Sequence, residues 1–292
     1  KFYLYGDKSM NKRDMSRVIE PLKKIGCFFY PPNKTTLPII LEGTSMPLAQ
    51  RHIEKRGSAQ IKSLILLSAL STPGITSIEE KKISRNHTEL FLKKINADIK
   101  VKKLKEGNLI TLKGQKNLHA FNYTINSDPS SASFFIALTL LTPNSKLLIK
   151  NVICNSTRTG FLKILKEKMN ANIKVKNLKK ISGEPVGTIV IRSSSLKSAN
   201  CPKKLVPFLI DEYCILFIIA AMTKGISKFT GISELRHKES DRIKSMEIGL
   251  NKIGIKTKST YDSLKIYGNP DIKIRKKLDI FSNNDHRVAM SW

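Results

Sequence analysis

Cysteine and aromatic residues are scarce in this sequence, and each scarcity argues against a class of protein. Four cysteines occur in 292 residues, and none forms a CxxC pair or lies beside a histidine at the spacing of metal ligands. We therefore expect reduced structural thiols and neither a disulfide framework nor a zinc site. Aromatic residues make up 7% of the chain, so a core must depend on Ile, Leu and Val.

Long apolar runs are missing as well. A membrane-spanning helix needs roughly 20 consecutive apolar residues, and the longest run here, Cys214 to Met222, is far shorter and suits a buried helix. The sequence also has no Walker A loop, no convincing GxGxxG motif and no nucleophile elbow near its five histidines. We expect a cytoplasmic protein that makes no contact with a membrane.

Acidic residues are outnumbered, with 23 Asp and Glu against 52 Lys and Arg and a net charge of +29. Taken alone, this charge suggests binding to nucleic acid or to an acidic surface. However, the lysines are spread along the whole chain, and no block of five or more like charges forms a basic arm. We favour a solvated basic surface, and the alternatives are a basic cleft for small anions and a nucleic-acid-binding protein.

An internal repeat organises the chain. Each copy starts with a strongly apolar helix, continues through a turn and a short strand, and ends with an amphipathic helix and a hairpin. The clearest hairpin joins Asp98–Lys103 to Leu109–Lys113, and the clearest amphipathic helix runs from Arg242 to a stop at Gly254. Such units should pack buried helices under sheets. The apolar helices are predicted over residues 61–70, 132–141 and 213–222, and the strands that follow them over 75–78, 147–149 and 226–229.

Polar residues open the three apolar helices at equivalent positions, which are Gln60, Ser130 and Asp211. The residues around them are typical N-caps. A helix N-terminus also suits phosphate or carboxylate, because it offers unpaired N–H groups and a positive dipole end. Capping alone explains any one of these positions, but three in register favour a shared polar cleft. Arg85 and Arg158 stand at one loop-to-helix junction in two copies.

The densest run of charges spans residues 236–242, and its position predicts the start of a helix. Lys238 and Arg242, four residues apart, should share a helix face, and Glu239 lies close enough in sequence to pair with Arg242. The run is either an ion-pair ladder on the surface or a cationic clamp for an anion. In the second interpretation the clamp holds one carboxylate for proton transfer.

Seven short segments carry a resemblance to a known family. They are SAQIKS at 58–63, SRNHTE at 84–89, DPSSA at 128–132, TRTG at 157–160, IDEY at 210–213, KESDR at 238–242 and DHRVAMS at 285–291. In this order and near this spacing they resemble the 5-enolpyruvylshikimate-3-phosphate synthase family, over essentially the whole chain. The resemblance implies an α/β (α+β) fold of two domains, built from repeated βαβαββ units with buried helices.

The resemblance also implies a division of the chain. Residues 1–124 would be part of the first substrate-binding domain, and residues 125–292 part of the second. We expect a fragment that lacks both termini of the family, with the N-terminal unit of the first domain missing and the last unit of the second incomplete.

The activity implied by the resemblance is that of a transferase in the shikimate pathway of aromatic amino acid biosynthesis. Members transfer the enolpyruvyl group of phosphoenolpyruvate to the 5-hydroxyl of shikimate 3-phosphate through a tetrahedral intermediate and release phosphate. Two phosphates and two carboxylates meet in one site, so several cations are needed. No metal or organic cofactor is implied. The expected partners are the two substrates, without nucleic acid, and we expect a monomer.

Residue roles follow from the resemblance alone. Ser58 and Arg85 would hold the shikimate phosphate, the backbone N–H of Ala59 would occupy a phosphate-binding position, and Gln60 would lie over the ring. The other site residues would act on phosphoenolpyruvate and on the protons. Arg13, Arg242 and Arg287 would clamp phosphoenolpyruvate, Lys238 would bridge the substrates, Asp211 would be the base for the 5-hydroxyl, and Glu239 would be the acid that protonates the methylene carbon.

Two alternatives stay open. The transferase that acts on UDP-N-acetylglucosamine shares the fold and the chemistry, but it lacks the KESDR and DHR-AMS runs and commonly uses a reactive cysteine. A nucleic-acid-binding protein would need exposed aromatic residues beside the lysines, and the sequence offers few.

Overall fold

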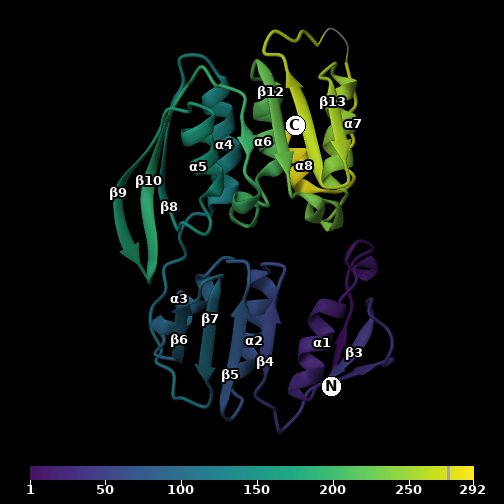
Figure 1. Cartoon of the computed structure of the whole chain (residues 1–292), viewed down its shortest axis with the longest axis vertical. Coiled ribbons are helices and arrows are strands. Elements are labelled where there is room, and N and C mark those ends of the chain that lie inside the picture. The colour runs from purple at the N-terminus through teal and green to yellow at the C-terminus, as the bar shows by residue number, and fades with distance from the viewer. Residues whose placement is uncertain (275–276) are drawn as a thin grey trace. The chain divides into compact units, whose positions relative to one another are not determined.

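Figure 1 shows the computed structural model, which describes residues 1–274 and 277–292. The chain divides into two compact units, Lys1–Tyr123 (unit 1) and Thr124–Trp292 (unit 2). The division lies one residue before the boundary expected from the sequence. The assignment of each unit to a domain of a longer enzyme stays a prediction.

Unit 1 contains a four-stranded sheet with two helices. Its elements are β4 (Arg51–Glu54), α2 (Ala59–Ala69), β5 (Ile75–Glu80), α3 (His87–Lys94), β6 (Asp98–Lys103) and β7 (Asn108–Lys113). The strand order is β4-β5-β7-β6, in which β4 and β5 are parallel and the other neighbours antiparallel. Ile65 of α2, Ile78 of β5 and Ile110 of β7 are fully buried and belong to one core.

A smaller antiparallel sheet occupies the start of unit 1. Its strand order is β1 (Phe2–Leu4), β3 (Ile39–Glu42) and β2 (Phe28–Tyr30). The short 3-10 helix η1 (Met10–Lys12) and helix α1 (Ser16–Ile25) precede β2 in the chain. Ile19, Phe29 and Ile39 form a separate small core between α1 and this sheet.

Unit 2 begins with a three-stranded antiparallel sheet and two helices. The strand order is β8 (Lys146–Ile153), β10 (Glu184–Arg192) and β9 (Ile173–Ile181). Helix α4 (Pro129–Leu141) comes before β8, and α5 (Gly160–Lys168) lies between β8 and β9 in the chain. Alternate residues of β10, including Ile189 and Ile191, are fully buried under the helices.

The rest of unit 2 repeats the same plan. Its sheet has the order β11 (Asn200–Cys201), β12 (Gly225–Thr230), β14 (Ser263–Gly268) and β13 (Thr257–Thr260), with β11 and β12 parallel. The helical elements are η2 (Lys203–Phe208), α6 (Tyr213–Ala221), η3 (Ser233–His237), α7 (Arg242–Lys252) and α8 (His286–Ser291).

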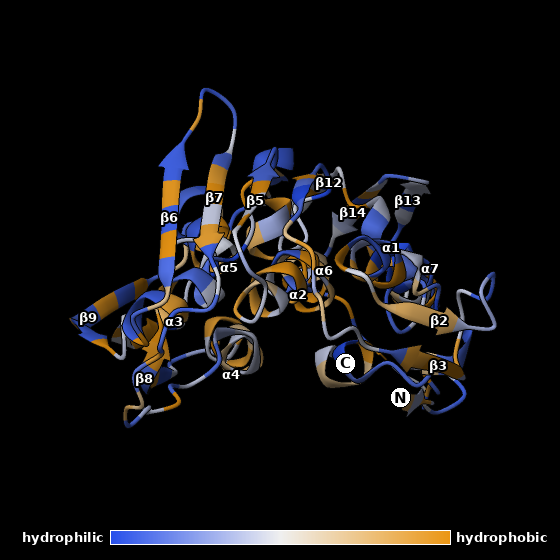
Figure 2. Cartoon of the chain, turned by 90° about the horizontal axis from the view of Figure 1, so that it is seen from below, coloured by the Kyte–Doolittle hydropathy of each residue, from blue (hydrophilic) through white to orange (hydrophobic). Residues whose placement is uncertain are grey.

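Helix α6 is the centre of the unit 2 core. It is apolar on all sides, as a helix enclosed by protein must be, and Figure 2 shows its hydrophobic ribbon in the interior. It contacts α4, α7 and α8. Three aromatic side chains pack in this core: the ring centroids of Phe217 and Phe229 are 4.9 Å apart, and Tyr213 contacts both rings.

The predicted repeat is confirmed. Each apolar helix, following strand and amphipathic helix lies where the pattern predicts it, and the hairpin of β6 and β7 pairs Lys103 with Asn108 at its turn. Helix α4 begins three residues before the predicted start. The carboxylate of Asp128 caps it by accepting hydrogen bonds from two backbone N–H groups, and Pro129 suits a first helical position.

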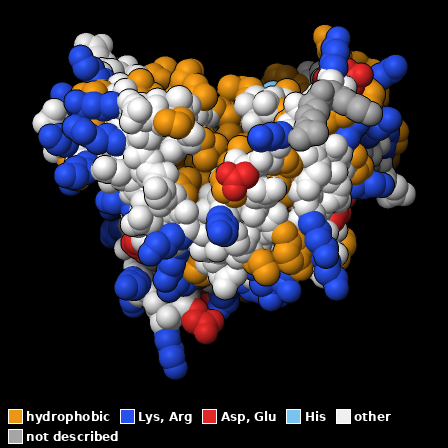
Figure 3. All heavy atoms as spheres, turned by 90° about the horizontal axis from the view of Figure 1, so that it is seen from above, with side chains coloured by type: hydrophobic (Ala, Val, Ile, Leu, Met, Phe, Trp, Pro, Cys, Tyr) orange, Lys and Arg blue, Asp and Glu red, His pale blue; other side chains and the backbone are white. Residues whose placement is uncertain are grey.

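The surface is rich in cations, as a chain with 52 Lys and Arg residues requires. On the face shown in Figure 3, Lys and Arg side chains are spread widely, with few acidic side chains among them. None of the helices in the described residues has the length and apolar character that crossing a membrane requires.

Candidate active site

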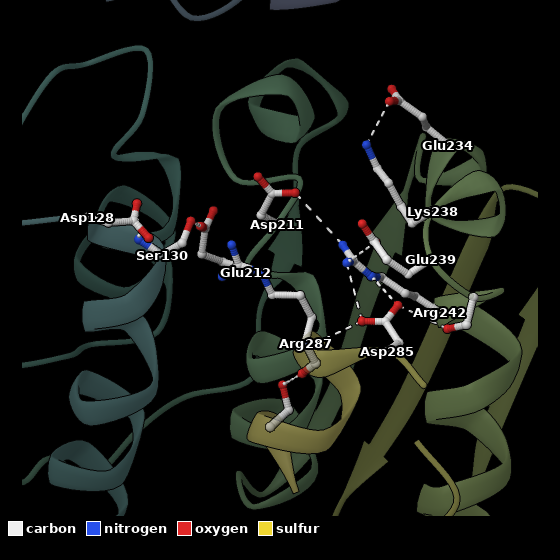
Figure 4. A network of polar contacts seen from close by, with 12 residues as sticks. Asp128, Ser130, Asp211, Glu212, Glu234, Lys238, Glu239, Arg242, Asp285 and Arg287 are labelled. Atoms are coloured by element: carbon white, nitrogen blue, oxygen red, sulfur yellow. Dashed lines mark hydrogen bonds and ion pairs between the residues drawn. The ribbon is translucent and has the colours of Figure 1, made fainter. Parts of the chain in front are cut away.

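Three helix starts in unit 2 bring their polar residues together (Figure 4). The turn of Asp211 and Glu212 precedes α6, Arg242 is the first residue of α7, and Asp285 is the N-cap of α8. The three helices contact one another in one apolar core. Packing of their apolar faces therefore fixes where the polar residues at their starts lie.

Arg242 is the centre of this cluster, and only 2% of its side chain is exposed. Its Nε donates to Asp285 Oδ2 at 2.9 Å, and its Nη2 donates to Glu239 Oε2 at 2.6 Å. On the other side, Asp211 Oδ1 lies 3.8 Å from Nη1. The pair that the sequence predicts between Glu239 and Arg242 is therefore confirmed.

The Nη1 group of Arg242 is buried and has no hydrogen-bond partner in the part of the chain that the structure describes. A buried donor without a partner costs free energy, so its presence requires a reason. An oxygen of an anionic ligand would satisfy this donor with a charge-assisted hydrogen bond. The two fixed carboxylates around Nε and Nη2 leave Nη1 as the group that is available for such a ligand.

Lys238 and Glu239 precede helix α7 and lie outside it. The helix begins at Arg242, because the carboxylate of Asp241 caps it by accepting a backbone N–H of the first turn at 3.0 Å. Lys238 pairs instead with Glu234, four residues earlier, at 2.9 Å. The prediction that Lys238 and Arg242 share a helix face is therefore wrong.

Asp285 orients Arg242 and links it to Arg287. Its carboxylate is fully buried and also accepts a hydrogen bond from the backbone N–H of Arg287 at 2.9 Å. Burial opposes ionisation, but the hydrogen bond and the charge of Arg242 outweigh it, so the pKa of Asp285 is below its usual value. The side chain of Arg287 extends from α8 toward the start of α6 (Figure 4).

Sequence reasoning missed Asp285 as a functional residue, although it noted the DHR run. The sequence signal for Asp285 was its position directly before a short apolar stretch, where an Asp is a typical helix N-cap. Sequence reasoning assigned no role to Glu212, and it noted Arg158 only at the loop-to-helix junction that Arg85 shares and in the TRTG segment. Both side chains are buried in the structure and form an ion pair with Nη1 to Oε1 at 3.0 Å.

Cys214 is the second residue of α6 and lies beside this cluster. Burial raises the pKa of its thiol to about 12, and the nearby charges of Arg242, Asp285, Arg287 and Asp211 also act on it. Four of the charged groups around the start of α6 are therefore close enough to one thiol to influence its ionisation. The thiol itself stays protonated and neutral at neutral pH.

Unit 1 holds the other five predicted site residues. Ser58 is the N-cap of α2 and its Oγ accepts from the backbone N–H of Ile61 at 3.4 Å, while Ala59 is the first helical residue. Gln60 is exposed, and its Oε1 accepts from Arg17 Nη2 at 3.5 Å. The remaining two are Arg85, two residues before α3, and Arg13, the C-cap of η1.

A buried ion cluster connects the start of α2 with the loop that carries Arg85. Lys62 Nζ lies 2.9 Å from Glu80 Oε1 and 2.7 Å from Glu89 Oε1, and all three side chains are almost fully buried. The same oxygen of Glu80 accepts from both the backbone N–H and the hydroxyl of Ser84. Ser84 directly precedes Arg85, so Lys62 and Glu80 fix the start of the Arg85 loop relative to α2.

The chemistry of these groups suits anionic ligands and proton transfer. Unit 2 combines arginine and lysine side chains with carboxylates that are partly exposed, Asp211 at 22% and Glu239 at 33% of their side chains. Within the residues that the structure describes, no group of three or more His, Cys, Asp or Glu side chains is arranged to hold a metal ion.

Comparison with known proteins agrees with the resemblance. The model of the family EPSP synthase (3-phosphoshikimate 1-carboxyvinyltransferase) matches residues 1–292. The chain is 44% identical over 290 residues to the 3-phosphoshikimate 1-carboxyvinyltransferase of Petrotoga mobilis, and 41% identical over 287 residues to that of Carboxydothermus hydrogenoformans. Each alignment covers 98% of this chain and 65% of the relative, so the chain spans less than two thirds of these relatives' length.

Solved structures give the same result for the fold. The EPSP synthase of Acinetobacter baumannii superposes with a TM-score of 0.81 at 38% identity, over 99% of this chain and 65% of that one. The enolpyruvyl transferase NikO from Streptomyces tendae shares the fold, with a TM-score of 0.63 at 12% identity over 87% of this chain and 58% of its own. The predicted fold of two domains with α/β repeats is thereby confirmed, and the chain belongs to the EPSP synthase family.

Proposed function

We propose that the protein transfers the enolpyruvyl group of phosphoenolpyruvate to the 5-hydroxyl of shikimate 3-phosphate. The hydroxyl oxygen attacks C2 of phosphoenolpyruvate while C3 takes up a proton, which gives a tetrahedral intermediate. The intermediate then loses inorganic phosphate and a proton from C3, which leaves the enol ether. Relatives over 98% of this chain carry the name of this transferase, and that likeness supports the assignment.

The observation that carries the proposal is the buried Nη1 of Arg242, which lacks a hydrogen-bond partner among the described residues while Asp285 and Glu239 hold the rest of the guanidinium. Such a group is prepared to bind an anion without reorganising. We assign it to phosphoenolpyruvate, together with Arg287 of the same cluster. Lys238, paired with Glu234, would exchange that partner for substrate oxygens.

The proton transfers are assigned to two carboxylates of unit 2. Asp211 precedes the buried helix α6, where the positive end of the helix dipole favours the ionised form that a base requires. We assign it to the 5-hydroxyl. Glu239 hydrogen-bonds to Arg242 and is one third exposed, and we assign it to the methylene carbon.

Shikimate 3-phosphate is assigned to unit 1. Ser58 and Ala59 provide the hydroxyl and the first backbone N–H of α2, and helix starts of this kind bind phosphate well. Arg85 adds a positive charge. Gln60, which follows Ala59 in the chain, adds an exposed amide. The buried Lys62 and Glu80 support this assignment, because they fix the Arg85 loop relative to α2.

Calorimetric titration of the full-length protein tests the substrate class. Shikimate 3-phosphate should bind, and phosphoenolpyruvate should bind more tightly in its presence. Binding of UDP-N-acetylglucosamine instead of shikimate 3-phosphate would overturn the proposal in favour of the related transferase. We also propose that the enzyme is a monomer, that it is cytoplasmic and that it does not bind nucleic acid. Sedimentation tests the oligomeric state, and cell fractionation tests the location. A salt-dependent DNA titration tests nucleic-acid binding.

A further inference from the structure

A second buried ion network lies directly behind Asp211 in unit 2. Arg158 Nη1 donates to Glu212 Oε1 at 3.0 Å, and its Nη2 donates to Asp128 Oδ1 at 3.1 Å. The hydroxyl of Ser130 accepts from Arg158 and donates to Glu212 Oε1. Only 8% of the Arg158 side chain and 2% of the Glu212 side chain are exposed. The network therefore ties the starts of α4, α5 and α6 together.

The position of Arg158 in the repeat shows that it has a different task from Arg85. Both residues lie two positions before an amphipathic helix, α3 for Arg85 and α5 for Arg158. Arg85 is partly exposed, whereas Arg158 is buried and pairs with Glu212. At the same position of the repeat, Arg158 therefore binds another side chain of the protein, that of Glu212.

The backbone around Arg158 is also pressed against the segment that leads to Asp211. A Cβ on Gly160 would lie 2.9 Å from the backbone C and O atoms of Phe208, so only glycine permits this approach. Phe208 ends η2, three residues before Asp211. The turn that carries Arg158 and the turn that carries Asp211 are therefore packed backbone to backbone.

Stability alone does not explain a charge at Glu212. Its Oε2 is buried without a hydrogen-bond partner among the described residues, which is unfavourable. A buried ion pair is often no more stable than apolar residues of similar volume. However, the hydrogen bond between Arg158 and Glu212 fixes the orientation of the Glu212 side chain, which apolar packing would not do. Glu212 follows Asp211 in the chain, so Arg158 holds the turn from one side while Arg242, 3.8 Å from Asp211, approaches it from the other.

We propose that Arg158 is a positioning residue, which acts through Glu212 to set the direction of the Asp211 carboxylate toward the reacting hydroxyl. This inference rests on the proposed function, in which Asp211 is the base. Arg158 touches neither substrate in this account. Its effect belongs to the chemical step and not to the binding of either substrate.

The test compares Arg158→Met, Glu212→Leu and the double variant in the full-length protein. Each single variant leaves one buried partner uncompensated, so both should lower Tm and kcat. The double variant replaces the pair by apolar side chains and should regain most of the Tm. Its kcat should stay about tenfold to a hundredfold below wild type, with both KM values within about threefold. A double variant that regains wild-type kcat together with its Tm would overturn the proposal.

Two further variants separate positioning from stability. Ile136→Val removes a buried methyl group from α4 outside the network, and it should lower Tm with an unchanged kcat. Glu212→Gln keeps an acceptor oxygen for Arg158 and Ser130, so kcat should remain within about threefold of wild type. A kcat in Glu212→Gln as low as in Arg158→Met would overturn the proposal, even if the double variant failed to fold.

Wild-type turnover is measured first. If the wild-type protein does not turn over shikimate 3-phosphate and phosphoenolpyruvate, the proposed function has failed. If it does, and the double variant is as active as wild type, only the positioning role of Arg158 has failed.

Discussion

Arg242 donates through Nε to Asp285 at 2.9 Å, although 43 positions separate the two residues in the chain. Asp285 is fully buried and its own helix holds it, since the backbone N–H of Arg287 also donates to it. A guanidinium oriented by a buried carboxylate is ready to bind an anion without a search through rotamers.

Arg85→Ala and Arg287→Ala should weaken the binding of different ligands. Each loses a charge-assisted contact worth about 1.5–3 kcal/mol. The loss should fall mainly on shikimate 3-phosphate for Arg85→Ala and mainly on phosphoenolpyruvate for Arg287→Ala, as calorimetric titration of each ligand can measure. Each variant serves as the control for the other, and equal losses for both ligands in both variants would refute the assignment.

Asp211→Asn and Glu239→Gln should keep substrate binding within roughly tenfold and lower kcat by on the order of 10²–10⁴. The two variants should differ in the exchange of the phosphoenolpyruvate methylene hydrogens in deuterated water. This exchange requires protonation of carbon, so Glu239→Gln should suppress it most strongly. Wild-type exchange in Glu239→Gln would mean that Glu239 is only an ion-pair partner of Arg242.

Acid should destabilise unit 2 partly through Asp128. Burial raises its pKa, but the hydrogen bond from the backbone N–H of Ser130 and the charge of Arg158 outweigh it, so the folded pKa lies below its usual value. A lowered folded pKa adds stability that is complete above about pH 4 and is lost as the pH falls through the folded value.

Asp128→Asn removes this titrating group but keeps an N-capping side chain. Between about pH 5 and pH 3, its urea midpoint should therefore fall less than that of wild type. Asp271→Asn, which changes an exposed carboxylate outside the network, is the control and should follow the wild-type curve. If Asp128→Asn also followed that curve, the pairing of Asp128 with Arg158 would contribute nothing to acid stability.

Cys214 should react with a thiol-labelling reagent more slowly than Cys27 and Cys154. Its pKa of about 12 means that roughly one molecule in ten thousand carries the thiolate at pH 8, and the side chain is buried in α6. Cys27 and Cys154 are only partly buried and should react first with a maleimide, as peptide mass spectrometry can follow. Labelling of Cys214 at the rate of Cys27 would contradict the burial of the α6 start.

Much of the fold could be predicted from the sequence, because local patterns determine it. The helices α2, α4 and α6 follow from segments that are strongly apolar, and the hairpin of β6 and β7 follows from two strand-like segments around Gly107. The repeat itself is visible because the same sequence of patterns recurs. These features need no knowledge of which residues meet in space.

The side-chain geometry could not be predicted in the same way. Arg85 and Arg158 have the same spacing to the next helix, yet Arg158 turns inward because Glu212, 54 positions later, lies behind it. Lys238 lies outside α7 because Asp241 is the N-cap, so the helix begins only at Arg242. Both outcomes depend on contacts between segments that are distant in sequence.

Phosphate release by the full-length protein, measured with shikimate 3-phosphate and phosphoenolpyruvate together, is the direct test of the proposed enolpyruvyl transfer. We expect one phosphate for each enolpyruvyl ether detected by mass spectrometry, and no release when shikimate 3-phosphate is omitted or replaced by UDP-N-acetylglucosamine. Turnover with UDP-N-acetylglucosamine, or a well-folded protein that binds shikimate 3-phosphate and releases no phosphate, would contradict it.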